Sequence, residues 1–380
     1  MELTAEQKMV RDMVREFARD VLAPRAAEID ESGEFPWDIV KRMGELGLMG
    51  IPFPERWGGS GCDELTYAVA VEEIARVCAS TAITMAAHTS IGTGPIYLFG
   101  TEDQKVKYLI PLARGEMIGA FAMTEPNAGS DVGSTESTAI RRGDRYILNG
   151  TKMFCTNAGV ADVLVVTARL DKGSGIEGIT TFLVEKDMPG LKMGKKENKM
   201  GWRGSDTRAF TMEDLEMPLG NLLGVEREGF KQNMQVLEGG RISIAALSLG
   251  VAEAALDASI SYAAQRKQFG KTIGHFQTIR FKIADMVTGV EAGKHLTYHA
   301  ARLRDAQKAH GKEAAIAKLF CSELATKSAL EAIQIHGGYG YIKDYPVERY
   351  LRDAKVCEIG EGTSEIQRLI IARLVMGREE

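Results

Sequence analysis

The pattern of apolar and polar positions divides the chain into a helical, a β and a second helical stretch. Residues 1–116 carry apolar positions at helical spacing. The first predicted helix opens with a Thr4-x-x-Gln7 capping box, and we expect Pro24 to end its regular run. Further helices are predicted over residues 37–48, 65–78, 82–98 and 100–109.

Residues 117–229 have a different pattern, with short apolar or alternating runs separated by turn residues. Their spacing is too close for helical crossovers, so it predicts a small β-barrel or sandwich rather than a βαβ domain. The predicted strands are 117–124, 146–148, 153–156, 163–168, 179–184 and 208–212.

Residues 230–380 return to helical periodicity, with long helices predicted over 233–264, 276–307 and 312–335. A short terminal helix is expected to begin at a capping box formed by Ser364 and Gln367. Long helices with short connections predict an antiparallel four-helix bundle. The chain is therefore predicted to be mainly α with a central β domain.

Composition narrows the class of protein. The 380 residues suffice for two or three domains with a large core, and a net charge of −5 provides no basic field for nucleic acid. We expect no membrane span, because no apolar run approaches the required length, and the N-terminus lacks a signal-peptide core. The five cysteines are widely spaced without a Cys-x-x-Cys motif, which indicates free buried thiols in a cytoplasmic protein.

Several cofactor motifs are absent from the sequence. No Gly-x-Gly-x-x-Gly follows a strand and opens a helix, and no phosphate-binding Gly-x-x-x-x-Gly-Lys-Ser/Thr or zinc-binding His-Glu-x-x-His occurs. His295 and His299 have a spacing that could place both on one helix face, but no third ligand is visible. We therefore expect no metal.

The most informative candidate is Glu361, which stands between Gly360 and Gly362 just before the terminal helix. Glycines let the backbone pass close to another molecule, so this carboxylate is free to point into a cavity. Desolvation there would raise its pKa and make it a usable general base. The other interpretation is that the acidic residue interacts with the helix dipole.

The C-terminal sequence resembles a known family. Gly-Gly-Tyr-Gly (337–340), Tyr-Pro-Val-Glu-Arg (345–349), Arg-Asp-Ala-Lys (352–355) and Gly-Glu-Gly-Thr-Ser-Glu-Ile-Gln-Arg (360–368) resemble the C-terminal signature of the acyl-CoA dehydrogenases. The resemblance covers nearly the whole chain, and the family's fold has the same order of domains. It implies domains at 1–116, 117–229 and 230–380, and it implies that Glu361 is the catalytic base.

The resemblance also implies an FAD site. Residues 124–131 are similar to the family's first flavin signature, and residues 149–159 are similar to its second. From the residues alone, an ordinary loop at 124–131 and a core role for Phe154 stay open. The implied FAD contacts are Phe121, Met123, Thr124, Gly129, Ser130, Phe154, Cys155, Thr156, Arg266, Gln268, Phe269, Phe276, Gln277, Gln334, Ile335, Gly337, Gly338, Thr363 and Glu365.

Substrate contacts are implied in the same way for Ser130, Glu238, Arg241 and Gly362. The isovaleryl and long-chain branches carry their catalytic Glu immediately before this Arg, where this chain has Gly240. The base is therefore placed at 361. Many short- and medium-chain members have Tyr where this chain has Gly360, so the acyl chain length stays open.

Together these features predict FAD-dependent conversion of a short- to medium-chain acyl-CoA into trans-2-enoyl-CoA, with electrons passing to electron-transfer flavoprotein. The nearest resemblance is to bacterial short-chain (butyryl-CoA) members. A flavin reached across a subunit contact implies a homo-oligomer, as a tetramer built from two dimers. Two alternatives stay open, which are a flavin oxidase or monooxygenase on the same scaffold and a non-catalytic helical partner protein.

Overall fold

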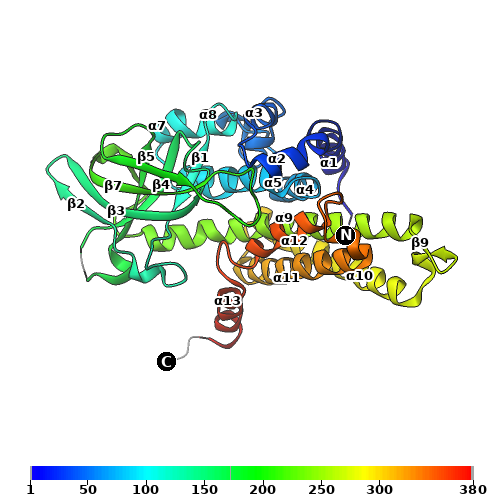
Figure 1. Cartoon of the computed structure of the whole chain (residues 1–380). Coiled ribbons are helices and arrows are strands. Elements are labelled where there is room, and N and C mark those ends of the chain that lie inside the picture. The colour runs from blue at the N-terminus through cyan, green and yellow to red at the C-terminus, as the bar shows by residue number, and fades with distance from the viewer. Residues whose placement is uncertain (1, 172, 378–380) are drawn as a thin grey trace.

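The computed structural model describes residues 2–171 and 173–377, and it confirms a mainly α chain with a central β domain. Figure 1 shows the sheet at one end of the molecule, the N-terminal helices above the long helix α9, and α10 to α12 below it. The N-terminal α-helices are α1 Ala5–Phe17, α2 Ala26–Ser32, α3 Trp37–Glu45, α4 Glu64–Ala75, α5 Ala79–Ala86, α6 Gly94–Phe99, α7 Glu102–Gln104 and α8 Ile110–Ala113.

Two details of the N-terminal prediction are wrong. Pro24 does not end the helical run, because a π-helical turn (Ala18–Leu22) leads into a 3-10 turn (Ala23–Arg25) that accepts proline in its first turn, and α2 follows directly. The helix expected over 82–98 is interrupted by a π-helical segment, Ala87–Thr93. Such segments inside α-helices are frequent at functional sites.

The β domain is one mixed sheet with the order β6-β7-β3-β2-β4-β5-β8, in which β1 lies parallel to β4. Residues 146–148 and 153–156, predicted as separate strands, belong to the single strand β3. The prediction missed β2 and β6 because both are largely exposed and polar. The strands are β1 Gly119–Ala122, β2 Thr138–Arg142, β3 Arg145–Thr156, β4 Val163–Arg169, β5 Ile179–Glu185, β6 Leu191–Lys196, β7 Thr207–Pro218 and β8 Leu222–Leu223.

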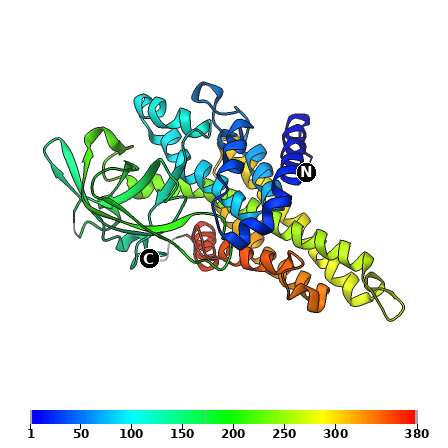
Figure 2. The ribbon, with the colours of Figure 1, turned by 45° about the horizontal axis from the view of Figure 1, so that its top comes forward.

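The C-terminal region contains the predicted long helices and one helix that was not predicted, α12. A small hairpin, β9 Lys267–Gln268 and β10 Lys271–Thr272, connects α9 to α10. Figures 1 and 2 place this hairpin at the end of the molecule away from the sheet. The helices are α9 Gly229–Gln265, α10 Gln277–Asp305, α11 Gly311–His336, α12 Val347–Cys357 and α13 Ser364–Met376.

Helix α13 begins as predicted, but its cap differs. Ser364 is the first helical residue, and Thr363 is the N-cap, because the Thr363 hydroxyl accepts a hydrogen bond from the Ile366 backbone N–H at 3.3 Å. Gln367 is fully buried and its side chain donates to the loop before the helix instead of completing a capping box. This loop contains Glu361.

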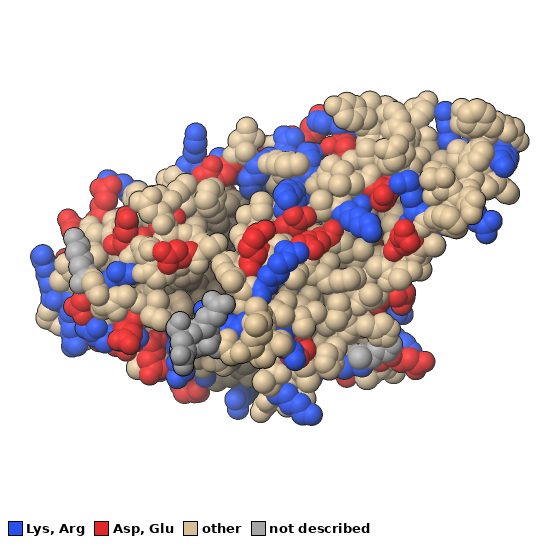
Figure 3. Space-filling view, turned by 90° about the horizontal axis from the view of Figure 1, so that it is seen from below, with Lys and Arg blue, Asp and Glu red and all other residues tan. Residues whose placement is uncertain are grey.

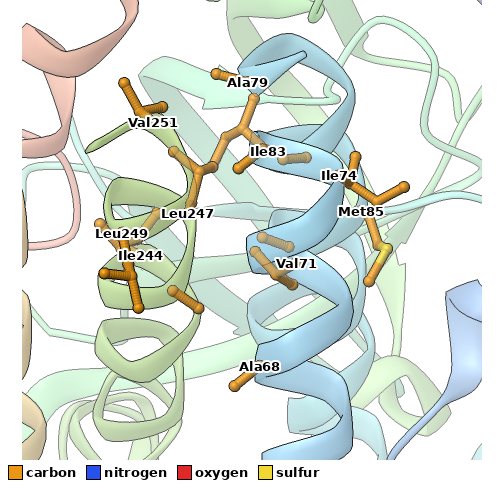
Figure 4. Close-up of a cluster of buried hydrophobic side chains, with 14 of the residues drawn as sticks. Ala68, Val71, Ile74, Ala79, Ile83, Met85, Ile244, Leu247, Leu249 and Val251 are labelled. Atoms are coloured by element: carbon orange, nitrogen blue, oxygen red, sulfur yellow. The ribbon is translucent and has the colours of Figure 1, made fainter. Parts of the chain in front are cut away.

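Helix α9 is the central core helix. It contains an 18-residue window with a mean hydropathy of 1.4, so the expectation that no apolar run reaches membrane-span length is wrong. That window is 89% buried inside the fold, which is the environment of a core helix. Figure 4 shows Leu247 of α9 extending toward Ile83 of α5, with α4 packed alongside.

The surface carries both signs of charge. Figure 3 shows Lys and Arg interspersed with Asp and Glu over the face seen from below. All five cysteines are free thiols; Cys62 is half-buried and the other four are buried, so the prediction of buried thiols holds for Cys78, Cys155, Cys321 and Cys357.

Candidate active site

Glu361 lies in the short loop between α12 and α13, and its backbone is strained. Its φ is 52° and that of Gly362 is 93°, both in the left-handed region. Non-glycine residues are uncommon there and concentrate at functional sites. Gln367 stabilises this backbone conformation, because its side-chain amide donates to the carbonyl oxygens of Glu361 at 3.2 Å and of Gly362 at 2.9 Å.

The Glu361 carboxylate points into the protein. The residue is half-buried as a whole, but Oε2 is shielded from solvent and has no hydrogen-bond partner among residues 2–171 and 173–377. Burial raises the pKa of Glu361 to about 7, against the opposing charges of Lys318 and Arg241. A carboxyl group with this pKa and a free oxygen can accept a proton near neutral pH.

Gly240 of α9 provides the space for this carboxylate. A Cβ atom at position 240 would lie 2.1 Å from Glu361 Oε2 and 3.1 Å from Cγ2 of Ile91. Any larger residue at 240 would therefore displace the carboxylate. The π-helical segment containing Ile91, α9 and the loop thus meet at one point.

The π-helical segment is fixed to the β domain by His88. The buried His88 ring has Nε2 3.1 Å from the Leu112 carbonyl oxygen, and Nδ1 accepts from the Gly119 backbone N–H at 3.0 Å. Burial lowers the pKa of His88 to about 4, so the ring is neutral near pH 7. This contact sets the position of Ile91 relative to strand β1.

Buried hydroxyl groups lie near Glu361, between α4, α9 and the π-helical segment. Ser243 and Ser90 are 3.4 Å apart, and the hydroxyls of Ser90 and Tyr67 both donate to the Ala86 carbonyl oxygen, at 2.6 and 3.2 Å. Because these side chains touch, α9 and the π-helical segment close off the space beside Gly240.

Arg241 is, with Lys318, one of two cations that act on Glu361. It is buried, and its Nε has no partner within the described part of the chain. Burial lowers the pKa of Arg241, and the charges of Glu238 and Glu361 oppose that shift. Glu238 is half-buried with Oε2 3.8 Å from Nε2 of His310, so it lies beside the start of α11.

The predicted flavin loop 124–131 is attached to strand β3. The Met153 backbone N–H donates to the Thr124 carbonyl oxygen at 2.9 Å. A buried ion pair of 2.6 Å joins Lys152 to Glu125, which also accepts from the Glu136 backbone N–H at 2.6 Å. The two sequence motifs therefore lie side by side, with Met123 buried, Thr124 half-buried, and Gly129 and Ser130 exposed.

Phe154 lies on a bulge of β3 and is not a core residue. The register of β3 with β7 shifts between Lys152 and Cys155, and Phe154 adopts a φ of 55°. Phe154 is 64% exposed, whereas Cys155 is buried and Thr156 is half-buried. An exposed aromatic ring in a strained backbone next to a hydroxyl suits one face of a planar ligand. Phe121, on β1, is half-buried.

A second group of predicted flavin residues lies around the β9–β10 hairpin and the end of α11. A cavity of about 560 Å³ is lined by Arg266, Gln268, Ile335, Gly337 and Gly338, together with Tyr262, Ile273, His336, Tyr339 and Ile342. Phe269 is 92% exposed at the tip of the β9–β10 hairpin, with its ring 6.0 Å from that of Phe276. Gln277 and Gln334 are also exposed. Arginine and glycine backbone groups in such a cavity suit a phosphate-containing ligand.

The remaining predicted residues have less specific surroundings. Thr363 caps α13, and Glu365 is exposed in its first turn. His295 and His299 are both exposed on α10. No cluster of three or more His, Cys, Asp or Glu side chains suited to a metal ion occurs within residues 2–171 and 173–377.

Sequence reasoning missed Lys318. This residue of α11 is completely buried, and its Nζ donates to the Gly362 carbonyl oxygen at 2.7 Å. The signal was present in the sequence, because Lys318 stands at helical spacing among Ala314, Cys321 and Ala325 on an otherwise apolar face.

Three domain models match this chain: the N-terminal domain of acyl-CoA dehydrogenase over residues 4–116, the middle domain over 120–215 and the C-terminal domain over 227–376. The probable acyl-CoA dehydrogenase YngJ of Bacillus subtilis is 54% identical over 376 residues, covering 99% of both chains. Butyryl-CoA dehydrogenase from Megasphaera elsdenii superposes with a TM-score of 0.97, at 43% identity over 99% of both chains.

A chain in a structure described as the electron transferring flavoprotein of Acidaminococcus fermentans superposes with a TM-score of 0.98, at 48% identity over 100% of both chains. Other solved structures with this fold are described as complexes with FAD.

Proposed function

Because the chain belongs to the acyl-CoA dehydrogenase family, we propose that Glu361 is the base that starts dehydrogenation of a short- to medium-chain acyl-CoA to its trans-2-enoyl product. Family membership makes the protein an FAD-dependent acyl-CoA dehydrogenase. The observation that carries the assignment of the base is the shielded, unpartnered Oε2 of Glu361, held in a strained loop opposite Gly240.

The chemistry divides between the cofactor and the chain. Bound FAD supplies a hydride acceptor for the β-hydrogen. The thioester of the substrate makes the α C–H acidic, and Glu361 Oε2 takes that proton. The backbone N–H of Glu361 is proposed to polarise the thioester carbonyl, as a donor in an oxyanion hole does.

The pKa of Glu361 leads to a pH-dependence. The base must be a carboxylate, and its pKa of about 7 keeps the proton on the group at lower pH. We therefore expect kcat/KM for an acyl-CoA to rise tenfold per pH unit below pH 7 and to level off above it. Initial rates between pH 5 and 9 would measure this limb. A rate that stays nearly flat down to pH 5 would mean that the carboxyl group is hydrated in solution and is not the desolvated base proposed.

The residues present fit FAD in two places. Phe154, Thr156 and Thr124 would hold the ring system, with Phe154 as an apolar wall. Arg266 and the backbone of Gly337 and Gly338 would hold the pyrophosphate in the second cavity.

The first group lies at the end of β3, where Asn157 donates to the Thr84 carbonyl oxygen of α5, and the second lies by the β9–β10 hairpin, at the end of the molecule away from the sheet in Figures 1 and 2. This separation supports a flavin shared between two copies of the chain. We infer a homo-oligomer, with the family's usual tetramer as the expected state. Dilution should then release FAD together with subunit dissociation. A monomer that keeps its yellow colour would contradict the shared site.

The proposed electron acceptor is electron-transfer flavoprotein. Its support is the similarity to a chain in the structure described as the electron transferring flavoprotein of Acidaminococcus fermentans. We also place the protein in the cytoplasm, where its buried cysteines would stay reduced.

An anaerobic titration tests the proposed reaction. The purified yellow protein is titrated with butyryl-CoA, octanoyl-CoA and isobutyryl-CoA, with NADH as control. Bleaching by an acyl-CoA supports the proposal, and the most effective chain indicates the substrate. Reduction by NADH alone would favour the monooxygenase alternative, and fast peroxide formation in air would favour the oxidase.

A further inference from the structure

Lys318 is a buried cation whose direct contact is a carbonyl group. Its side chain is fully buried on α11, and Nζ donates to the Gly362 carbonyl oxygen at 2.7 Å. Within the described residues it forms no ion pair shorter than 4.0 Å with a carboxylate. Burying a charged group costs free energy unless an opposite charge and hydrogen bonds compensate the lost hydration.

The Gly362 carbonyl does not require a charged donor. It also accepts from the neutral side chain of Gln367 at 2.9 Å, and Gln367 holds the Glu361 carbonyl as well. A neutral amide therefore already supports this loop. The extra property that Lys318 brings is its positive charge, one residue away from the strained Glu361.

We propose that Lys318 is a positioning residue for Glu361, which fixes the Gly362 carbonyl and supplies the charge that keeps the neighbouring carboxylate ionised when the reaction needs a base. This inference rests on the proposed role of Glu361. It assigns the charge of Lys318 a function that a merely structural lysine would not have.

Other charged and titratable groups lie near Lys318 and Glu361 and can also influence their ionisation. Arg241 faces Lys318 from α9, Cys357 from the last turn of α12, and Glu358 from the C-cap of α12. Tyr67 on α4 lies within electrostatic range of Glu361. Burial lowers the pKa of Lys318 to about 8, and Cys357, Glu361 and Glu358 oppose that shift. Lys318 is therefore charged through pH 7, in the range where Glu361 ionises.

The test separates charge from structure with two main variants. Lys318→Met removes the donor and the charge, and Lys318→Arg keeps the charge. The rate of anaerobic flavin reduction by butyryl-CoA is measured from pH 5.5 to 9 for each. In Lys318→Met the midpoint of the acid limb should move up by at least about one pH unit, which is about a tenfold loss of rate at low pH. Lys318→Arg should have a midpoint closer to the wild-type value than that of Lys318→Met.

Lys199 provides a matched control, because it is a half-buried lysine whose Nζ also donates to a backbone carbonyl, that of Ser205, at 2.8 Å. Lys199→Met should leave the midpoint unchanged. Lys318→Gln, which keeps a neutral donor, provides a third variant if Lys318→Met does not fold, and it should show the same upward shift.

A uniform loss of rate at every pH, with an unmoved midpoint, would overturn the proposal and leave Lys318 as a structural residue. The same profile for Lys318→Gln would have the same meaning. The Glu361→Gln variant distinguishes an error in the role of Lys318 from an error in the assignment of the base. If Glu361→Gln is inactive while the Lys318 variants keep the wild-type midpoint, only the role of Lys318 is wrong. If Glu361→Gln is active, the base assignment itself fails.

Discussion

Glu361→Gln should retain FAD and lose about 10²–10⁴-fold in the rate of flavin reduction by acyl-CoA. The amide has nearly the same shape as the carboxyl group but cannot accept the α-proton. Oε2 has no partner in the described structure, so the substitution breaks no side-chain hydrogen bond. Stopped-flow reduction with butyryl-CoA measures the loss, and the visible spectrum reports whether FAD is bound. A variant with the wild-type rate would place the base elsewhere.

The same variant should change stability in a pH-dependent way. The folded-state pKa of Glu361 is about 7, above the usual value of 4.5, so the folded protein holds this proton more tightly than the unfolded chain. The stability from this group is present below pH 4.5 and is lost as the pH rises to 7.

Glu361→Gln removes this dependence. Its unfolding free energy relative to wild type should therefore increase by roughly 2–3 kcal/mol between pH 5 and pH 8. Urea unfolding at both pH values, at equal protein concentration, measures the difference. An unchanged difference would mean that the Glu361 carboxyl is not desolvated.

Gly240→Ala should fold well and reduce activity by roughly 10²-fold, the effect of a displacement of about 1 Å at a reacting group. The new Cβ would lie 2.1 Å from Glu361 Oε2, and this carboxylate is the end of a flexible side chain that can move away. Alanine also favours the interior of α9 by roughly 1 kcal/mol over glycine. We therefore expect an unchanged or higher Tm together with the loss of rate.

The neighbouring Gly239→Ala is the matched control. Its Cβ would meet the guanidinium of Arg304, which is paired with Glu64 and lies outside the proposed site. This variant should lower the Tm and keep the wild-type rate. If Gly239→Ala and Gly240→Ala lose rate equally, the effect belongs to α9 as a whole and not to the contact with Glu361.

The fold could be predicted from periodicity wherever an element buries one clear face. The long helices α9, α10 and α11 and the apolar strands β4 and β5 were found within a few residues. Strands β2 and β6 were missed because their side chains are mostly exposed. The break at Ala87–Thr93 was not predicted, and its His88 contacts Leu112 and Gly119, which are distant in the sequence.

In the candidate site, some residues could be found from the local sequence and others only from the fold. The flanking glycines made Glu361 a candidate, and the resemblance to the family implied its role as base and the flavin role of residues 124–131. The pairing of Gly240 with Glu361 joins residues 121 positions apart and required the fold. Lys318 was missed because a single lysine on an alanine-rich face usually extends its charge to solvent, whereas this one lies under the Gly362 carbonyl.

The contact between Gly240 and Glu361 has an evolutionary consequence. Branches of the family that carry their base immediately before the helix arginine place it at the position of Gly240, and the structure leaves one buried volume for both positions. Gaining a carboxylate at position 240 first would place two like charges in that volume. Losing Glu361, the proposed base, first would leave no carboxylate there. Either order of the two substitutions passes through an impaired ancestor. Enzymes with the base at position 361 and enzymes with the base at position 240 should therefore persist as separate lineages.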